Sequence, residues 1–186
     1  MARLRTSRQL TMGLLGTLVV LYVSLLGMRV LWPIDFQDAI RHEAEMRGLP
    51  PDLVAAVAYA ESRLRADAVS PRGAIGMMQI MPATAMWIAE SLDEPVPSSE
   101  DLANAKLSLR YGTWYLAHLL DRFGDTESAL AAYNAGPTAV DTWRASGSDP
   151  FPETEAFVKR TLAARAIYRF YFAFPAVVRI TPALRF

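Results

Sequence analysis

Residues 59–82 read YAESRLRADAVSPRGAIGMMQIMP, and this stretch joins the end of an apolar helical pattern to a loop punctuated by glycine. Glu61 places one carboxyl group in the apolar pattern. Residues 70–73 (Ser-Pro-Arg-Gly) predict a turn, and a methionine-rich segment that contains Gln79 follows. The stretch therefore predicts a helix that ends beside a tight loop, with an acid near their junction.

The helix alone allows two interpretations of Glu61. Val57 and Leu64 lie about one helical turn away, and apolar neighbours raise the pKa of a carboxyl group, as a general acid working near neutral pH requires. Arg63 and Arg65 are instead typical of a solvated helix edge. Because most glutamates in helices are solvated, the helix pattern by itself favours the second interpretation.

The segments after the helix favour a functional acid. Gly73 and Gly76 indicate a close backbone approach or a positive φ angle, and Gln79 is an amide between two apolar residues. A buried amide needs a partner, and a sugar hydroxyl or N-acetyl group is one such partner. Further along the chain, Tyr133 and Asn134 precede a helix-ending glycine. This pattern is typical of a capped helix end, and it can also place a ring and an amide at the rim of a cleft.

Helical spacing of apolar residues continues on both sides of this stretch. We expect helices at residues 35–47, from 51 onward, and at 82–91, 108–123, 126–134, 137–146 and 152–172. Residues 93–104 are polar and interrupted by proline, which predicts a surface loop. Residues 177–181 have a strand-like alternation, and the aromatic residues at 114–115 and 168–172 are expected in the core. The sequence thus predicts a mainly helical, all-α domain.

The first 32 residues predict a membrane anchor. Residues 9–28 contain no charge and are long enough to span a bilayer as a helix, and three arginines precede them. This charge bias predicts a cytoplasmic N-terminus. A cleaved signal peptide is the alternative, although its apolar core is usually shorter. The expected organisation is an Arg-rich tip and transmembrane anchor (1–32), an extracytoplasmic domain (33–173), and a tail (174–186) that could pack on the domain or dock a partner.

Composition excludes several classes of function. The chain has 186 residues, of which 52% are hydrophobic, with 19 basic and 19 acidic side chains. Four of the basic residues lie within the first 29 positions, so the remainder is mildly acidic and a poor nucleic-acid binder. There is no cysteine, and His42 and His118 lie far apart. We therefore expect no metal site and no nucleic-acid partner.

Taken together, these segments resemble the lysozyme-like lytic transglycosylase domain of the soluble lytic transglycosylase (SLT) type. The resemblance covers roughly residues 34–169 and rests on the order and spacing of residues 61–62, 70–82, 84–85, 111–112, 115–116, 132–136 and 155–159. It implies the α-helical lysozyme fold, with Glu61 as the catalytic acid. It also implies that the sugar groove is lined, or the acid steadied, by Ser70, Gly76, Gln79, Met81, Tyr133 and Asn134. The chain departs from the family at Ser108, where many members have asparagine.

The resemblance implies a lyase that cleaves peptidoglycan between N-acetylmuramic acid and N-acetylglucosamine without water and leaves 1,6-anhydro ends. It needs no cofactor, because one carboxyl group acts first as acid and then as base. Ordinary glycosidases use two carboxyl groups, and Asp67 stays open as a second acid. A hydrolytic muramidase and a non-catalytic peptidoglycan-binding scaffold remain as alternatives. A membrane-tethered subunit of a cell-wall, secretion or division machinery is a further one, which is compatible with catalysis and leaves the partner unknown. The anchor favours the outer face of the bacterial cytoplasmic membrane.

Overall fold

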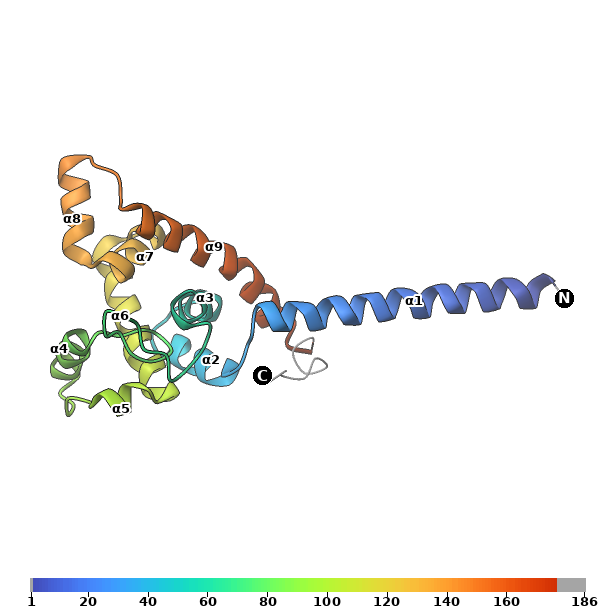
Figure 1. Cartoon of the computed structure of the whole chain (residues 1–186), viewed down its shortest axis with the longest axis horizontal. Coiled ribbons are helices and arrows are strands. Elements are labelled where there is room, and N and C mark those ends of the chain that lie inside the picture. Colours follow the sequence, from blue (N-terminus) through green and yellow to red (C-terminus); the bar gives the residue numbers. More distant parts are fainter. Residues whose placement is uncertain (1, 177–186) are drawn as a thin grey trace.

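The computed structural model describes the backbone of residues 2–176 and the side chains of residues 12–176. The helices in this range are α1 (Ala2–Leu31), α2 (Gln37–Met46), α3 (Pro51–Ser62), α4 (Pro82–Leu92), α5 (Ser99–Leu102), α6 (Ala105–Phe123), α7 (Thr126–Ala135), α8 (Pro137–Ser146) and α9 (Pro152–Ala173). Two isolated bridges pair Ile75 with Val69 and with Ile80, and the described residues otherwise form no β-structure. The prediction of an all-helical protein is confirmed (Figure 1).

Proline and glycine set several helix ends where the sequence predicts them. The helices α3, α4, α8 and α9 each begin with a proline, whose fixed φ angle suits the first turn and whose missing N–H needs no partner there. The helices α6 and α8 end at Gly124 and Gly147, which have φ angles of 78° and 69°. Such left-handed conformations are favourable for glycine and stop a helix.

Two local features differ from the sequence prediction. Residues 93–104, expected as a loop, contain the one-turn helix α5, because Ser98 and Asp101 cap it with reciprocal hydrogen bonds. The helix α6 begins at Ala105, earlier than expected, because the Asn104 side chain accepts two backbone N–H groups of its first turn at 3.0 and 3.4 Å.

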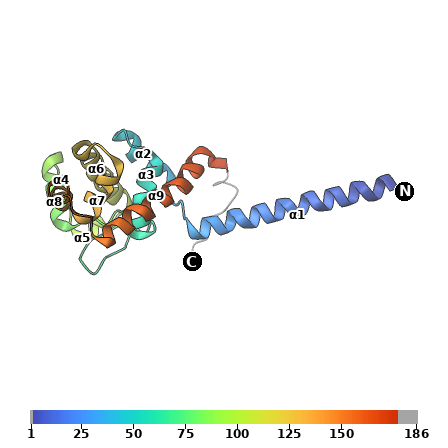
Figure 2. The ribbon, with the colours of Figure 1, turned by 90° about the horizontal axis from the view of Figure 1, so that it is seen from above.

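The helix α3 forms the centre of the core. All of its residues from Leu53 to Ala58 are buried, and three of them are alanines, which let neighbouring helices approach closely. It packs along α9 and against α2, and both views place it between these two helices (Figures 1 and 2). The helix α7 packs against α6, α8 and α9. Because the body of α3 is buried and closely packed, the position of its C-terminal end, where Glu61 lies, is fixed.

The helix α6 makes its closest approach to the methionine-rich loop at Gly112. A Cβ atom on Gly112 would lie 2.6 Å from Cγ and 2.8 Å from Cε of Met78, which is fully buried. Real Cβ atoms do not come so close to another heavy atom. Glycine is therefore required here for α6 to pack against the loop.

The helix α1 projects away from the helical domain (Figures 1 and 2). By length and composition, the segment Met12–Leu31 could cross a membrane as a helix, and only 6% of it is buried in the structure. At its C-terminal end Met28 and Trp32 pack against the core, and Arg29 is buried. Most of the expected tail, including the strand-like residues 177–181, lies outside the described residues.

We predict that Gly112→Ala destabilises the protein by about 1–3 kcal/mol, because the added methyl group overpacks a buried site. Urea unfolding of the full chain in detergent, followed by circular dichroism, measures the change. The matched control is Ala145→Ser, which also adds one heavy atom to a helix but at an exposed position of α8. Its unfolding free energy should change by no more than about 0.5 kcal/mol. Equal stabilities of the two variants would contradict the packing argument.

Candidate functional site

Glu61 lies in the last turn of α3, beside a hollow of about 320 Å³. The two residues after the helix, Arg63 and Leu64, have φ angles of 56° and 62°, so the chain turns sharply where α3 ends. The lining residues are Tyr59, Ala60, Glu61, Ser62, Arg63, Arg65 and Arg160. Glu61 is half-buried, and it is the one acidic residue among the described residues that line this hollow.

Burial changes the acid–base chemistry of Glu61. Loss of hydration disfavours the carboxylate and raises the pKa of Glu61 to about 8, although the positive charge of Arg160 acts in the opposite direction. The group is therefore mostly protonated at pH 7. A protonated carboxyl group on the wall of an open hollow is suited to donate a proton to an oxygen atom bound there.

Side chains from three helices hold the loop that follows α3. The Ser62 hydroxyl donates a hydrogen bond to the Met77 carbonyl at 2.8 Å, and the Tyr133 hydroxyl donates to the Met78 carbonyl at 2.8 Å. The Met78 N–H donates to the hydroxyl of Ser108 at 3.0 Å. Ser108, where the sequence departs from the family pattern, is therefore buried and bonded to the loop. Two successive peptide groups thus connect α3, α6 and α7.

Tyr133 links this loop to the acid. Its side chain is buried, and burial raises the pKa of its hydroxyl well above the usual value, with the charges of Glu61 and Tyr115 acting in the same direction. The hydroxyl therefore stays protonated and keeps its hydrogen bond to Met78. The structure brings Tyr133 within electrostatic range of Glu61, and the ring of Tyr115 lies 5.3 Å from that of Tyr133, centroid to centroid.

Three other residues implied by the resemblance stabilise the loop from within. The Gln79 amide donates to two backbone carbonyl groups of the loop at 2.9 and 3.0 Å. The Ser70 hydroxyl accepts a backbone N–H of its own turn at 3.0 Å. Gly76 has a φ angle of 84°, and a Cβ atom there would lie 2.6 Å from the Ser108 hydroxyl. Among the described contacts, none of the three hydrogen-bonds to the carboxyl of Glu61.

The remaining predicted residues lie at the ends of helices. Met81 is 41% exposed and immediately precedes α4. The Asn134 side chain accepts a hydrogen bond from the Thr154 hydroxyl at 2.9 Å, which joins the end of α7 to the start of α9. Asp67, left open as a second acid, is exposed and does not line the hollow beside Glu61.

A second hollow, of about 370 Å³, is lined by aromatic rings. Trp87 is 38% exposed and packs edge-on against Tyr115 and His118, at centroid distances of 6.1 and 5.0 Å. Trp114 stacks on His118 at 5.6 Å. The prediction that residues 114–115 belong to the core holds only in part, because both are half-buried and Tyr115 lines this hollow. Helical spacing shows which residues share a face, but not whether a neighbour covers that face.

Arg160 and Tyr59 belong to the hollow of Glu61 and were not predicted from the sequence. Arg160 comes from α9, far along the chain, and no local pattern distinguishes it from other arginines of that helix. Tyr59 precedes Glu61 by half a turn, and its hydroxyl donates to the carbonyl of Leu31 at 3.0 Å. Finding either residue requires knowing how α9 and α1 dock on α3.

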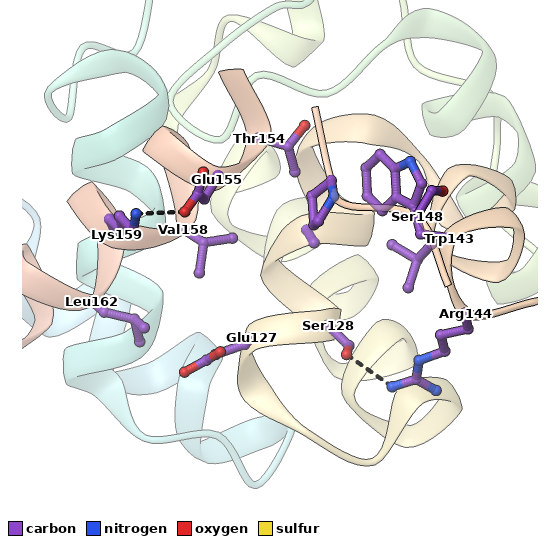
Figure 3. A pocket seen from close by; sticks show the side chains of 13 residues that line it. Glu127, Ser128, Trp143, Arg144, Ser148, Thr154, Glu155, Val158, Lys159 and Leu162 are labelled. Carbon is purple, nitrogen blue, oxygen red and sulfur yellow. Dashed lines mark hydrogen bonds and ion pairs between the residues drawn. The ribbon is translucent and has the colours of Figure 1, made fainter. Parts of the chain in front are cut away.

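A third hollow, of about 460 Å³, lies between α7, α8 and α9 (Figure 3). Its walls include the apolar side chains of Val140, Trp143 and Leu162, and at its edge Lys159 pairs with Glu155 at 2.5 Å. None of the residues implied as site residues by the resemblance lines it. Within the described residues, no group of three or more histidine or acidic side chains is arranged to hold a metal ion.

Comparison with known proteins gives a consistent family assignment. The family described as Transglycosylase SLT domain matches residues 38–153. The chain is 33% identical over 153 residues to the soluble lytic murein transglycosylase of Escherichia coli (strain K12), a match that covers 75% of this chain and 24% of the relative. It is 33% identical over 117 residues to the membrane-bound lytic murein transglycosylase C of Actinobacillus pleuropneumoniae, which covers 57% of this chain and 32% of the relative.

Solved structures share the same fold. An inactive glutamate-to-glutamine mutant of lytic transglycosylase Slt from Pseudomonas aeruginosa matches with a TM-score of 0.73 and 29% identity, over 78% of this chain and 26% of that chain. A complex of the 70-kDa soluble lytic transglycosylase with bulgecin A matches with a TM-score of 0.72 and 32% identity, over the same shares. These matches confirm the expected lysozyme-like fold. The chain spans about a quarter of the length of the soluble lytic transglycosylases that it matches.

We predict that Glu61→Gln stabilises the folded protein, by an amount that grows with pH. The folded-state pKa of about 8 lies above the ordinary value of 4.5, so the folded protein keeps a proton that the unfolded chain loses. Stability therefore falls as pH rises between these two values. Because an amide does not ionise, the variant should gain about 3 kcal/mol at pH 7 and almost nothing at pH 4.

Urea unfolding of the full chain at both pH values measures the gain. Glu90→Gln is the matched control, since it makes the same chemical change at an exposed position of α4. A gain from Glu61→Gln that is equal at pH 4 and pH 7 would mean that the carboxyl group does not hold its proton in the folded state.

Proposed function

The chain belongs to the transglycosylase SLT domain family, and we propose that it is a lytic transglycosylase that cleaves the β-1,4 bond between N-acetylmuramic acid and N-acetylglucosamine in peptidoglycan. Relatives that it resembles are named lytic murein transglycosylases. The observation that carries the proposal is Glu61, a carboxyl group on the wall of an open hollow whose pKa burial raises to about 8. One related structure is described as inactive when a glutamate is replaced by glutamine, which supports a reaction that depends on a carboxyl group.

The proposed reaction uses Glu61 twice. Its proton goes to the oxygen that bridges the two sugars, and the bond from that oxygen to C1 of the muramic acid breaks. The positive charge that develops at C1 is stabilised by the acetamido oxygen of the same sugar. The C6 hydroxyl of that sugar then bonds to C1 and gives its proton to the ionised Glu61. The products are a free N-acetylglucosamine end and a 1,6-anhydro end, and the enzyme returns to its starting state.

A single carboxyl group favours this route over hydrolysis. Hydrolytic glycosidases use a second carboxyl group as nucleophile or as the base that activates water. Among the described residues, the hollow of Glu61 contains no other acid, and Asp67 is exposed elsewhere. Ring closure by the sugar's own hydroxyl needs no such partner, because the ionised Glu61 is already beside the reacting centre.

The surrounding residues have two proposed roles. We propose that Tyr133, Ser62 and the loop that they hold fix the position of Glu61, since their hydrogen bonds to the loop are buried. The aromatic hollow at Trp87 and Tyr115 lies beyond Tyr133 and offers flat apolar faces for sugar rings. We infer that a glycan strand occupies both hollows. Gln79, Ser70 and Gly76 are proposed to act by shaping the loop, which their hydrogen bonds and backbone conformation support. Met81 and Asn134 line neither hollow, and their contact with the glycan remains a prediction from the family resemblance.

We also propose that α1 anchors the enzyme in the bacterial cytoplasmic membrane, with the domain on the outer side. The proposal is supported by the apolar span Met12–Leu31 and by three arginines that precede it. One relative is named a membrane-bound transglycosylase. A cleaved signal peptide is the competing assignment for the same segment.

Incubation of the full chain with purified peptidoglycan should release muropeptides with 1,6-anhydro ends. Mass spectrometry distinguishes them from muramidase products, which are heavier by one water for each bond cleaved. Heavier products would identify the protein as a hydrolase that uses the same groove.

Glu61→Gln should reduce this release by at least about a thousandfold, because the amide cannot donate the required proton. Glu90→Gln should keep wild-type turnover. Near-normal activity of Glu61→Gln would exclude Glu61 as the acid. An inactive wild-type protein that binds glycan would indicate a peptidoglycan-binding scaffold.

Protease added outside intact spheroplasts should degrade the domain and leave the protein's N-terminal segment in the membrane fraction. The reason is that an uncleaved anchor with arginines at its start exports everything after residue 32. Immunoblotting with tags at both ends measures the outcome. A domain that is degraded only after lysis would mean the opposite orientation, and a soluble periplasmic domain without its first residues would indicate cleavage.

A further inference from the structure

Three arginines surround the hollow of Glu61. Arg63 and Arg65 follow α3 directly, and Arg160 reaches the same hollow from α9. All three are exposed, and within the described residues none of them takes part in an ion pair. Because Glu61 is mostly protonated at neutral pH, the hollow carries close to three positive charges, and none of them lies within ion-pair distance of a carboxylate among the described residues.

Two of these guanidinium groups are oriented by the protein. The side chain of Arg65 donates from Nε to the carbonyl of Ser62 at 3.2 Å. The guanidinium of Arg160 lies over the ring of Phe157, 5.7 Å from its centroid. Arg63 has a left-handed backbone conformation, which directs the chain around the end of α3. Guanidinium groups held in this way are suited to bind a multiply charged anion through paired hydrogen bonds.

The same hollow lies next to the end of the expected membrane span. Tyr59, one of its lining residues, donates its hydroxyl to the carbonyl of Leu31, the last residue of α1. Tyr168 packs edge-on against Tyr59, at 5.9 Å between centroids, and donates to the carbonyl of Pro33 at 2.8 Å. Arg29 is buried beside this pair. If α1 spans a bilayer, one tyrosine side chain separates the membrane surface from the hollow of Glu61.

Two exposed phenylalanines lie at the end of α9. Phe170 is 37% exposed and Phe174 is 55% exposed, and their rings lie 5.1 Å apart. Nearby in α9, the Tyr168 hydroxyl donates to the carbonyl of Pro33, two residues after the end of α1. Adjacent exposed apolar side chains are one mark of a surface that contacts a membrane or a partner. Because Tyr59 lines the hollow and also bonds to the last residue of α1, the hollow and its arginines lie near the bilayer surface in the proposed arrangement.

We propose that Arg63, Arg65 and Arg160 bind the diphosphate group of glycan strands that are still linked to a membrane lipid. The inference rests on the proposed function, both for cleavage at Glu61 and for anchoring by α1. Glycans assembled on a membrane carry a diphosphate between the first sugar and the lipid, so this anion lies at the bilayer surface. A diphosphate presents several charged oxygens on neighbouring phosphorus atoms, which matches a cluster of guanidinium groups better than a single carboxylate does.

The chemistry at Glu61 is unchanged by this assignment. The bond that breaks joins C1 of a muramic acid to its neighbour on the side of the lipid, and the bond that forms closes the 1,6-anhydro ring. The diphosphate ester stays intact. The released strand carries the anhydro end, and the lipid keeps the diphosphate with the sugars between it and the cut.

The test uses the full chain in phospholipid nanodiscs with two substrates of the same glycan. One is still linked to its lipid through the diphosphate, and the other has been released by mild acid, which removes lipid and phosphate together. The wild-type kcat/KM should be about tenfold or more higher for the lipid-linked strand. In Arg63→Gln/Arg65→Gln the ratio of the two values should fall by roughly tenfold, to the preference that comes from sharing a bilayer alone. In Arg63→Lys/Arg65→Lys it should be intermediate, because lysine keeps the charge without the paired geometry.

The control is Arg110→Gln, which removes one positive charge from the surface of α6 away from the hollow, where Arg110 pairs with Glu94, and should keep the wild-type ratio. A ratio that is equal in the wild type and in Arg63→Gln/Arg65→Gln overturns the proposal, because the preference would then come only from sharing a bilayer. Recognition of stem-peptide carboxylates would give another result. Loss of the arginines would then change the ratio of kcat/KM between released strands with and without stem peptides. It would leave the ratio between lipid-linked and released strands unchanged, which also overturns the proposal.

Failure of the proposed function gives a different result. A wild-type protein that cleaves neither substrate, or that produces no anhydro ends, refutes the proposed function together with this inference. A wild-type protein that forms anhydro ends from both strands, with a ratio that does not depend on Arg63 and Arg65, refutes this inference alone.

Discussion

The peptide groups of Met77 and Met78 are the point on which the rest of the domain depends. Their buried polar atoms are bonded by Ser62, Ser108 and Tyr133, which come from three different helices. A buried peptide group without a partner costs about 1–3 kcal/mol, so each of these helices must keep its position relative to the loop. Gly76 and Gly112 leave the space that this packing of the loop against α6 requires, because a Cβ atom at either position would collide with a neighbouring residue.

The chemistry of Glu61 follows from the same packing. The helix α3 is buried along most of its length, and Ser62 in its last turn is buried and bonded to the loop. One face of the last turn stays open to a hollow, so the carboxyl group loses hydration without losing access to a ligand. Burial and accessibility are usually opposed, and the sharp turn after Ser62 is what allows both at one side chain.

Local features of the molecule could be predicted from the sequence, and features that depend on docking could not. Pro51, Pro82 and Gly124 set helix ends through their own backbone preferences, so these boundaries could be read directly. Glu61 was suggested by its neighbours in the chain and by the family resemblance. Arg160 was missed, because its place beside Glu61 depends on how α9 packs on α3. From its apolar neighbours in the sequence, Gln79 suggested a contact with a sugar. In the structure its amide nitrogen donates to two backbone carbonyl groups. The sequence does not distinguish a sugar oxygen from a backbone carbonyl as the acceptor.

The junction of α1 with the domain has a consequence for how substrate is met. The hydroxyl of Tyr59 bonds to the carbonyl of Leu31, the last residue of α1, and the hydroxyl of Tyr168 bonds to the carbonyl of Pro33, so the connection from α1 to the domain is held at both points. If α1 spans the bilayer as proposed, a domain mounted in this way rotates about the helix axis and diffuses within the plane of the bilayer, at a nearly constant height above the lipid. Its encounter with glycan would then be a two-dimensional search, whose rate depends on the number of strands per unit of membrane area rather than on their concentration in the surrounding volume.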